Sequence, residues 1–366
     1  MESVTSQVPR PVSIKSRVGD NAEQNLAKKD RVLTLLPGLM AAVVLGTVAT
    51  VLGHLVPVVG APVFAIVGGI GIALLRQPSN RERPGLAFSS RVVLQGSIVV
   101  LGTGLSFHQV LVTGTSSLPV LLGSLAVALV GAAILGRILS IDKDLRTLIG
   151  VGTGICGASA IAATNAVISA SEADVSYAIA TIFTFNVVAV LVFPTLGHLL
   201  SLSPHAFGLW AGTAINDMSS VAAASSIFGH GATSYAVVVK LTRTLMIIPI
   251  SIGLAFWRSR QNHHPDASAQ IPRALGNLRQ IMPVFIGWFL VTVTANTVGL
   301  VPGSWHGVLS GIAQVMITVA LAAIGLSTNF RDIRRAGLKP LALGAMLWLL
   351  VALSSLGLQL ATGKLA

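Results

Sequence analysis

Long apolar stretches recur along almost the whole chain, and they constrain its fold more than any other feature. Roughly eleven stretches approach the ~20 residues that a helix needs to cross a bilayer. They are apolar throughout, whereas the strands of a membrane β-barrel alternate between apolar and polar residues. The stretches lie near residues 35–57, 61–75, 88–105, 117–139, 147–170, 176–200, 206–228, 233–257, 281–301, 304–326 and 340–361.

This pattern predicts an all-α, polytopic helical membrane protein with about 9–11 spans. Only 10% of the residues are charged, against about 25% in a soluble protein. The composition therefore excludes a soluble enzyme, a disordered protein and a nucleic-acid-binding domain. Residues 1–32 are polar and of mixed charge and do not resemble a cleavable signal peptide. We expect them to form a disordered cytoplasmic tail, followed by a single transmembrane domain over 33–366.

The basic residues lie between the apolar stretches and indicate how the chain is oriented. Connections near 106–116, 201–205, 229–232 and 302–303 contain no Lys or Arg. Positive residues are retained on the cytoplasmic side of a membrane, so we expect a cytoplasmic N-terminus in a multi-pass protein of the bacterial inner membrane. The net charge of +12 is then a topology signal that needs no nucleic acid. It is carried by the segments 1–31, 76–91, 137–146, 258–279 and 331–339.

Two internal repeats run through the apolar stretches. The first relates 88–139 to 304–361, and its clearest match is Gly104-Leu105-Ser106 with Gly325-Leu326-Ser327. The second relates 147–200 to 206–257, where the sequence GTGICGAS is echoed by GTAINDMS. Repeats that contain glycine-interrupted hydrophobic segments are typical of secondary transporters.

The orientation of the repeats depends on whether two of the stretches cross the membrane. If every stretch crosses, the first pair of repeats is inverted and the second pair is parallel. If 147–170 and 206–228 are re-entrant hairpins instead, both pairs are inverted. The distribution of positive charge fits both schemes, and the sequence leaves the choice open.

Three charged residues lie inside the stretches and away from their ends: Asp217, Lys240 and Arg243. Each costs at least ~2.5–3.5 kcal/mol at the bilayer centre, so such residues face a partner or a cavity. One interpretation is a structural Asp–Arg or Asp–Lys pair, and the other is a substrate or ion site. Two cations against one carboxylate leave a surplus positive charge, which predicts a bound anion. Alternatively, Lys240 snorkels to the membrane surface.

Glycine-rich segments in the second repeat predict two interrupted helices. Irregular backbone at membrane depth is tolerated only where it lines a cavity or is buried in protein. A half-helix that starts near Ala158 would direct its free N–H groups into such a cavity, which favours an anion. The alternative is that small residues only let helices pack closely. The expected breaks are Gly152, Gly154, Gly157 and Gly212, and the expected polar lining is Thr153, Cys156, Ser159, Asn165, Thr213, Asn216, Ser219 and Ser220.

Signals for other chemistry are weak. Cys156 is the only cysteine and has no identifiable His partner, so we expect neither a catalytic thiol nor a Cys-rich metal site. No phosphate-binding loop is present, and ATP-driven pumping by this chain is unsupported. We expect no cofactor and no enzymatic activity.

The segments 152–194 and 212–252 closely resemble a family of bacterial membrane proteins known as sulfate exporters of the YeiH type. The likeness runs from about residue 35 to residue 361. This family is grouped with cation/proton antiporters, anion transporters and bile-acid symporters. The resemblance implies an inverted-repeat core with two interrupted helices that cross near the midplane beside a panel domain. In segment 152–165 the proline usual in the symporter motif is replaced by Gly157.

The leading hypothesis is therefore a secondary active transporter of a small oxyanion such as sulfate or a sulfonate. Asp217 would be the coupling group for H⁺ or Na⁺, while Lys240 and Arg243 would neutralise the substrate. The main alternative is an anion channel, since interrupted helices also line pores. An intramembrane enzyme has less support. Carriers with a panel domain often form homodimers, so a second copy of the chain is a candidate partner.

Overall fold

The computed structural model describes residues 14–56, 60–229, 231–251, 253–254, 284–328 and 337–365, with side chains from Thr34 onward. Every regular element in these ranges is helical, and seven helices are long and apolar enough to cross a membrane. The prediction of an all-α polytopic protein is confirmed at this level. The helices are α1 (Ile14–Leu55), α2 (Ala61–Leu75), α3 (Arg83–Phe88), η1 (Ser89–Val93), α4 (Leu94–Gly102), α5 (Phe107–Ile138), α6 (Lys143–Gly154), α7 (Ala158–Ile168), α8 (Glu172–Leu199), α9 (Pro204–Ala214), α10 (Met218–Phe228), α11 (Ala232–Thr244), α14 (Val284–Thr297), η2 (Gly303–Trp305), α15 (His306–Ser327) and α17 (Leu338–Ala361).

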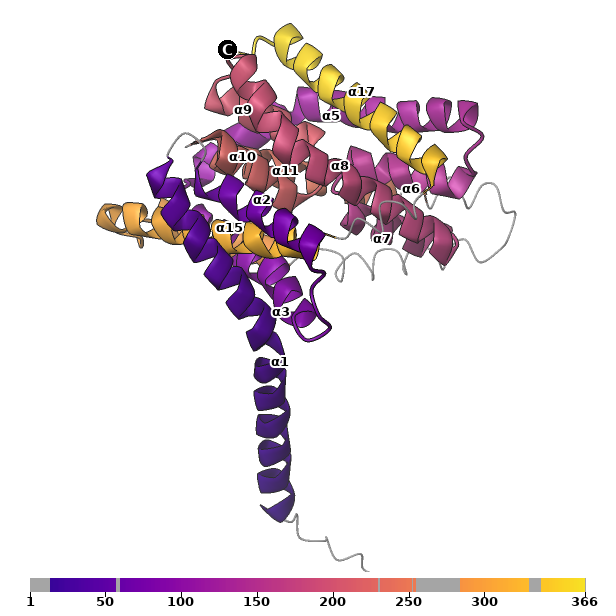
Figure 1. The fold of residues 1–366 in the computed structure, drawn as a ribbon. Helices are drawn as coiled ribbons and strands as arrows, with labels where there is room; N and C mark the ends of the chain where they lie inside the picture. Colours follow the sequence, from indigo (N-terminus) through magenta and orange to yellow (C-terminus); the bar gives the residue numbers. More distant parts are fainter. Residues whose placement is uncertain are drawn as a thin grey trace, which may run out of the picture.

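Two expected stretches differ from the rest because each is divided into short helices. The stretch 147–170 forms α6 and α7, and 206–228 forms α9 and α10. The prediction of two interrupted helices is confirmed, while the inverted relation between the repeats stays a prediction. Helix α1 begins at Ile14 and projects from the rest of the molecule (Figure 1), and disorder over 1–32 stays a prediction. Residues 1–13 lie outside the described residues.

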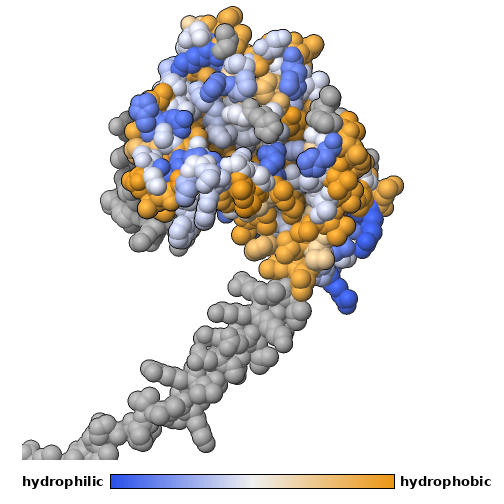
Figure 2. Space-filling view, turned by 90° about the vertical axis from the view of Figure 1, so that its left-hand side faces the viewer, coloured by the Kyte–Doolittle hydropathy of each residue, from blue (hydrophilic) through white to orange (hydrophobic). Residues whose placement is uncertain are grey.

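Large apolar side chains cover the outside of the long helices. Val44 and Val48 on α1, Ile134 on α5 and Leu353 on α17 are exposed, and Figure 2 shows broad hydrophobic areas on one face of the molecule. Monomeric soluble proteins rarely expose contiguous apolar areas of this kind. The exposed faces are therefore the surface that contacts lipid.

Packing divides the helices into two groups, which we call the first and second bundles. The first bundle consists of α1–α4, η1, α14 and α15, which contact one another extensively. The second bundle consists of α5–α11 and α17 and includes both interrupted helices. Figure 1 shows α1, α2, α3 and α15 together on one side and α5, α6, α8 and α17 on the other.

Contact between the bundles is sparse. It is made by α10 against α2 and α15, by α11 against α4, and by α14 against α5. Small and branched apolar side chains such as Ala222, Ala223 and Ile317 fill part of this boundary. Across the described boundary, side-chain hydrogen bonds join Gln314 Nε2 to Ser226 Oγ at 2.8 Å and Phe107 N to Thr297 Oγ1 at 2.8 Å. The described boundary is therefore built mainly from apolar contacts.

Glycines let α2 and α15 approach closely within the first bundle. A β-carbon added at Gly69 would lie 2.8 Å from the backbone N of Leu326, whereas one added at Gly71 meets nothing within 4 Å. We expect Gly69→Val to destabilise the bundle by several kcal/mol through overpacking, at or above the usual ~1–3 kcal/mol. Thermal unfolding in detergent should show a large fall in Tm for this variant. Gly71→Val, on the same helix, is the matched control and should leave the Tm nearly unchanged.

Candidate functional site

The two helix breaks lie beside each other inside the second bundle. The first break separates Gly154 from Ala158, and the second separates Ala214 from Met218. A β-carbon added at Gly157 would lie 3.4 Å from the β-carbon of Asp217. Four helix ends therefore meet at one place: the C-terminal ends of α6 and α9 and the N-terminal ends of α7 and α10.

Of the four glycines predicted to interrupt a helix, only Gly157 has a non-helical backbone conformation. Gly157 has φ +68°, a left-handed conformation that favours glycine. Gly154 ends α6, but Gly152 and Gly212 lie inside α6 and α9, so the prediction that these two interrupt a helix is wrong. Their role is close packing, because a β-carbon at Gly212 would lie 2.7 Å from Val239 Cγ1.

Lys240 and Arg243 on α11 hold the C-terminal ends of both interrupted helices. Lys240 Nζ donates to the carbonyl oxygens of Ile155 at 2.9 Å and Ile215 at 2.7 Å. Arg243 Nε donates to Gly154 O at 2.6 Å and Nη2 donates to Thr153 O at 2.9 Å. Arg243 Nη1 donates to Thr213 O. Both side chains are 0% exposed.

These contacts correct the predicted role of the two cations. The last carbonyls of a helix lack intrahelical partners and carry about half a negative charge, so two helix ends offset much of the positive charge. Within the described residues, neither cation forms a salt bridge with Asp217. The structure therefore contradicts the structural acid–base pair and the snorkelling lysine, because both cations are buried and clamp backbone carbonyls, while direct neutralisation of a substrate stays a prediction.

Asp217 has a different task, since it caps the N-terminus of α10. Its Oδ1 accepts from Ser220 N at 2.6 Å and from Ser219 Oγ at 2.8 Å, and its Oδ2 accepts from Ser220 Oγ at 3.0 Å. A carboxylate at this position satisfies free N–H groups and interacts favourably with the helix dipole. Asp217 and Ser219 are half-buried rather than fully enclosed.

Asn186 on α8, which is not among the predicted site residues, ties this cap to the preceding residue. Asn186 Nδ2 donates to Asp217 Oδ2 at 3.1 Å, and its Oδ1 accepts from Asn216 N at 3.2 Å. The side chain is 2% exposed. An isolated amide inside the apolar stretch 176–200 was the available signal, because buried amides need partners.

The remaining predicted residues divide into those at the crossing and those away from it. Ser159, in the first turn of α7, is exposed, whereas Cys156 is buried. Asn165 lies toward the other end of α7, where its Oδ1 accepts from Ala170 N. Thr213 Oγ1 bonds with Ser355 Oγ of α17 at 2.6 Å. The hydroxyl of Thr213 and the amide of Asn165 therefore do not contribute to the polar groups at the helix crossing.

Two buried oxygens near the crossing are left without partners. Among the described residues, Thr153 Oγ1 and Asn216 Oδ1 make no hydrogen bond, although both side chains are 1% exposed. In addition, the N-cap residue of α7 is Gly157, which has no side chain that could cap the helix. Buried polar groups are normally satisfied, so this region has unused capacity for a polar ligand. Within the described ranges, no three His, Cys, Asp or Glu side chains gather as metal ligands.

Comparison with known proteins places the chain in a family. The family described as Conserved hypothetical protein 698 matches residues 37–344. The chain belongs to this family. Relatives in the Conserved hypothetical protein 698 family are similar to this chain along nearly their whole length. No solved structure matches the chain. A UPF0324 membrane protein of Streptococcus pyogenes serotype M3 is 40% identical over 90% of this chain and 98% of its own. One of Streptococcus pneumoniae serotype 4 is 41% identical over 89% and 97%.

These relatives identify a bacterial multi-pass membrane protein. A third relative, a UPF0324 membrane protein of Streptococcus agalactiae serotype V, is 38% identical over 90% of this chain and 98% of its own. The names of these members of the Conserved hypothetical protein 698 family describe membrane proteins and give no substrate. They bear out the membrane assignment.

Proposed function

We propose that the protein is a secondary active transporter that moves a small oxyanion across the bacterial inner membrane by alternating access. The observation that carries this proposal is the meeting of two interrupted helices inside one bundle, which touches its neighbour over a sparse boundary. Interrupted helices whose ends face one point are the ion and substrate sites of many carriers. Sulfate or a related sulfonate is the proposed substrate, on the strength of the family resemblance.

The sparse boundary favours a carrier over an anion channel. A carrier must move one group of helices against another, and interfaces that are small and poor in hydrogen bonds permit such rigid-body movement. The described boundary is mostly apolar and contains few hydrogen bonds. We therefore propose that the second bundle, with its crossing, moves against the first and exposes the site to each side in turn.

The proposed anion site is the N-terminus of α7. Its free N–H groups and positive dipole end attract an oxyanion, and the exposed hydroxyl of Ser159 adds a donor. Thr153 Oγ1 has no internal partner and provides another donor at the same break. This assignment differs from the sequence hypothesis, because Lys240 and Arg243 shape the site and do not contact the substrate.

Asp217 is the proposed coupling group. Its β-carbon lies close to Gly157, the residue that immediately precedes α7. An ionised carboxylate here repels an anion at α7, so H⁺ or Na⁺ at Asp217 would favour anion binding. Coupling between two binding sites is reciprocal, so a bound anion would favour binding of H⁺ or Na⁺ at Asp217 by the same free energy.

We expect Asp217→Asn to abolish gradient-driven anion transport, because the amide carries no ionisable charge. The measurement is flux of radiolabelled sulfate, sulfite and organic sulfonates in proteoliposomes, with and without imposed H⁺ or Na⁺ gradients. The gradient-driven flux should fall at least tenfold, which is equivalent to about 1.4 kcal/mol. Asp142→Asn, which removes an exposed carboxylate with no capping bond, is the matched control. Normal gradient-driven flux in the Asp217 variant would refute the coupling role.

A further inference from the structure

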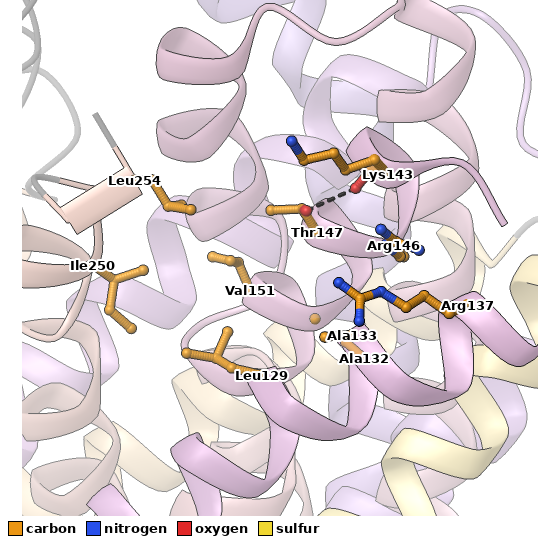
Figure 3. A pocket seen from close by; sticks show the side chains of 11 residues that line it. Leu129, Ala132, Ala133, Arg137, Lys143, Arg146, Thr147, Val151, Ile250 and Leu254 are labelled. Carbon is orange, nitrogen blue, oxygen red and sulfur yellow. Dashed lines mark hydrogen bonds between the residues drawn. The ribbon is translucent and has the colours of Figure 1, made fainter. Parts of the chain in front are cut away.

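A pocket of about 490 Å³ lies between α5, α6 and the segment that follows α11. Three basic residues, Arg137, Lys143 and Arg146, line one part of it. Apolar side chains such as Leu129 and Ile250 line the other part, and Figure 3 shows the two kinds of residue on different sides of the space. Thr153, Asn216 and Asp217 are absent from its lining, so it is separate from the helix crossing.

The local sequence brings two arginines together at the end of a spanning helix. Arg137 lies in the last turn of α5, and Arg146 lies in the first turns of α6, after the short connection between them. Gly136 lets the helices touch, because a β-carbon there would lie 2.7 Å from Arg146 Cβ. The approach of the two helices therefore places two guanidinium groups along one pocket.

These two arginines lie outside the salt bridges found among the described residues. Of the residues that the structure describes, none forms a salt bridge with Arg137 or Arg146. The guanidinium group is planar and always charged, and its fork of donors matches the oxygens of a phosphate. The pocket thus has an unused capacity for an anionic group.

The pocket is cationic at one end and apolar at the other. Leu129 precedes Arg137 by eight residues, which corresponds to about 12 Å along α5. One leaflet contributes about 15 Å of hydrocarbon. The apolar part of the pocket, which also includes Val151 and Leu254, therefore lies at the depth of acyl chains. A free oxyanion would make no favourable contact with this apolar part of the pocket.

We propose that this pocket binds an anionic phospholipid, with its phosphate between Arg137 and Arg146 and an acyl chain along Leu129 and Ile250. Basic pockets between membrane helices recognise lipid headgroups in this way. The headgroup is held by charge-assisted hydrogen bonds and the chain by the apolar wall. This proposal does not depend on the transport function.

The test is native mass spectrometry of the full-length, delipidated protein in detergent, titrated with phosphatidylglycerol or with zwitterionic phosphatidylcholine. We expect phosphatidylglycerol to bind at least tenfold more tightly, and the double variant Arg137→Gln, Arg146→Gln to lose this preference. The double variant Arg81→Gln, Arg91→Gln changes the net charge equally at exposed positions outside the pocket. It should retain the preference.

A second variant tests the apolar wall without changing the charge. Ala133 lines the pocket and is exposed, so Ala133→Trp should fill the space without disturbing the core and should weaken phosphatidylglycerol binding at least fivefold at an unchanged Tm. Millimolar sulfate should not displace the lipid. Equal losses in the two arginine double variants, unchanged binding in Ala133→Trp, or displacement by sulfate would each overturn the proposal.

Discussion

Arg243→Met is expected to cause a large loss of stability. The guanidinium group donates to the carbonyl oxygens of Thr153, Gly154 and Thr213. Methionine is similar in length and apolar, but it donates no hydrogen bond. Each carbonyl left buried without a partner costs ~1–3 kcal/mol. The total is therefore a large fraction of the ~5–15 kcal/mol that stabilises a typical protein.

The Arg243→Met experiment is thermal unfolding of the purified protein in detergent, with the yield of folded protein as a second readout. Arg243→Lys keeps the positive charge but loses the planar fork, so its Tm should fall between those of Arg243→Met and the unchanged protein. Arg91→Met removes an exposed cation and should leave the Tm almost unaltered. If Arg243→Met unfolds at the same temperature as Arg91→Met, the clamp does not stabilise the crossing.

The same clamp shows where prediction from sequence succeeds and where it fails. Asp217, Lys240 and Arg243 stand out because charges in apolar stretches are costly, and the structure places all three around the two breaks. Their partners could not be predicted, because the acceptors are backbone carbonyls that exist in every residue and carry no sequence signature. The surplus of positive charge therefore suggested a ligand where the protein supplies helix ends.

The long helices were predictable because continuous apolar stretches have few alternatives in a membrane. The division into two bundles was not, since the same lipid-compatible residues form both the outer faces and the boundary. The predictions from glycines were only partly correct, because glycine serves two different purposes in the structure. Gly157 has a backbone that favours glycine, while Gly212 has an ordinary helical backbone and is needed only for close packing against Val239; the two uses look alike in a sequence.

A cross-link between the bundles should stop transport, because the proposed mechanism requires them to move against each other. Gln314 of α15 and Ser226 of α10 meet across the boundary, with Nε2 and Oγ 2.8 Å apart. In a Cys156→Ala background, which removes the only native cysteine, Ser226→Cys and Gln314→Cys would create a pair that a short dithiol-reactive reagent can bridge. We expect sulfate flux to fall at least about tenfold, a change of ~1.4 kcal/mol in the barrier to movement.

The matched control is a second pair within the first bundle. Asn296 of α14 and His306, at the start of α15, bond at 2.9 Å, and both belong to helices that would move together. Bridging Asn296→Cys with His306→Cys should therefore leave flux close to that of the unbridged variant. Cleavage of a reducible bridge should restore transport in the first pair. Full flux through a protein bridged between Ser226→Cys and Gln314→Cys would show that the bundles stay fixed during transport, as they would in a channel.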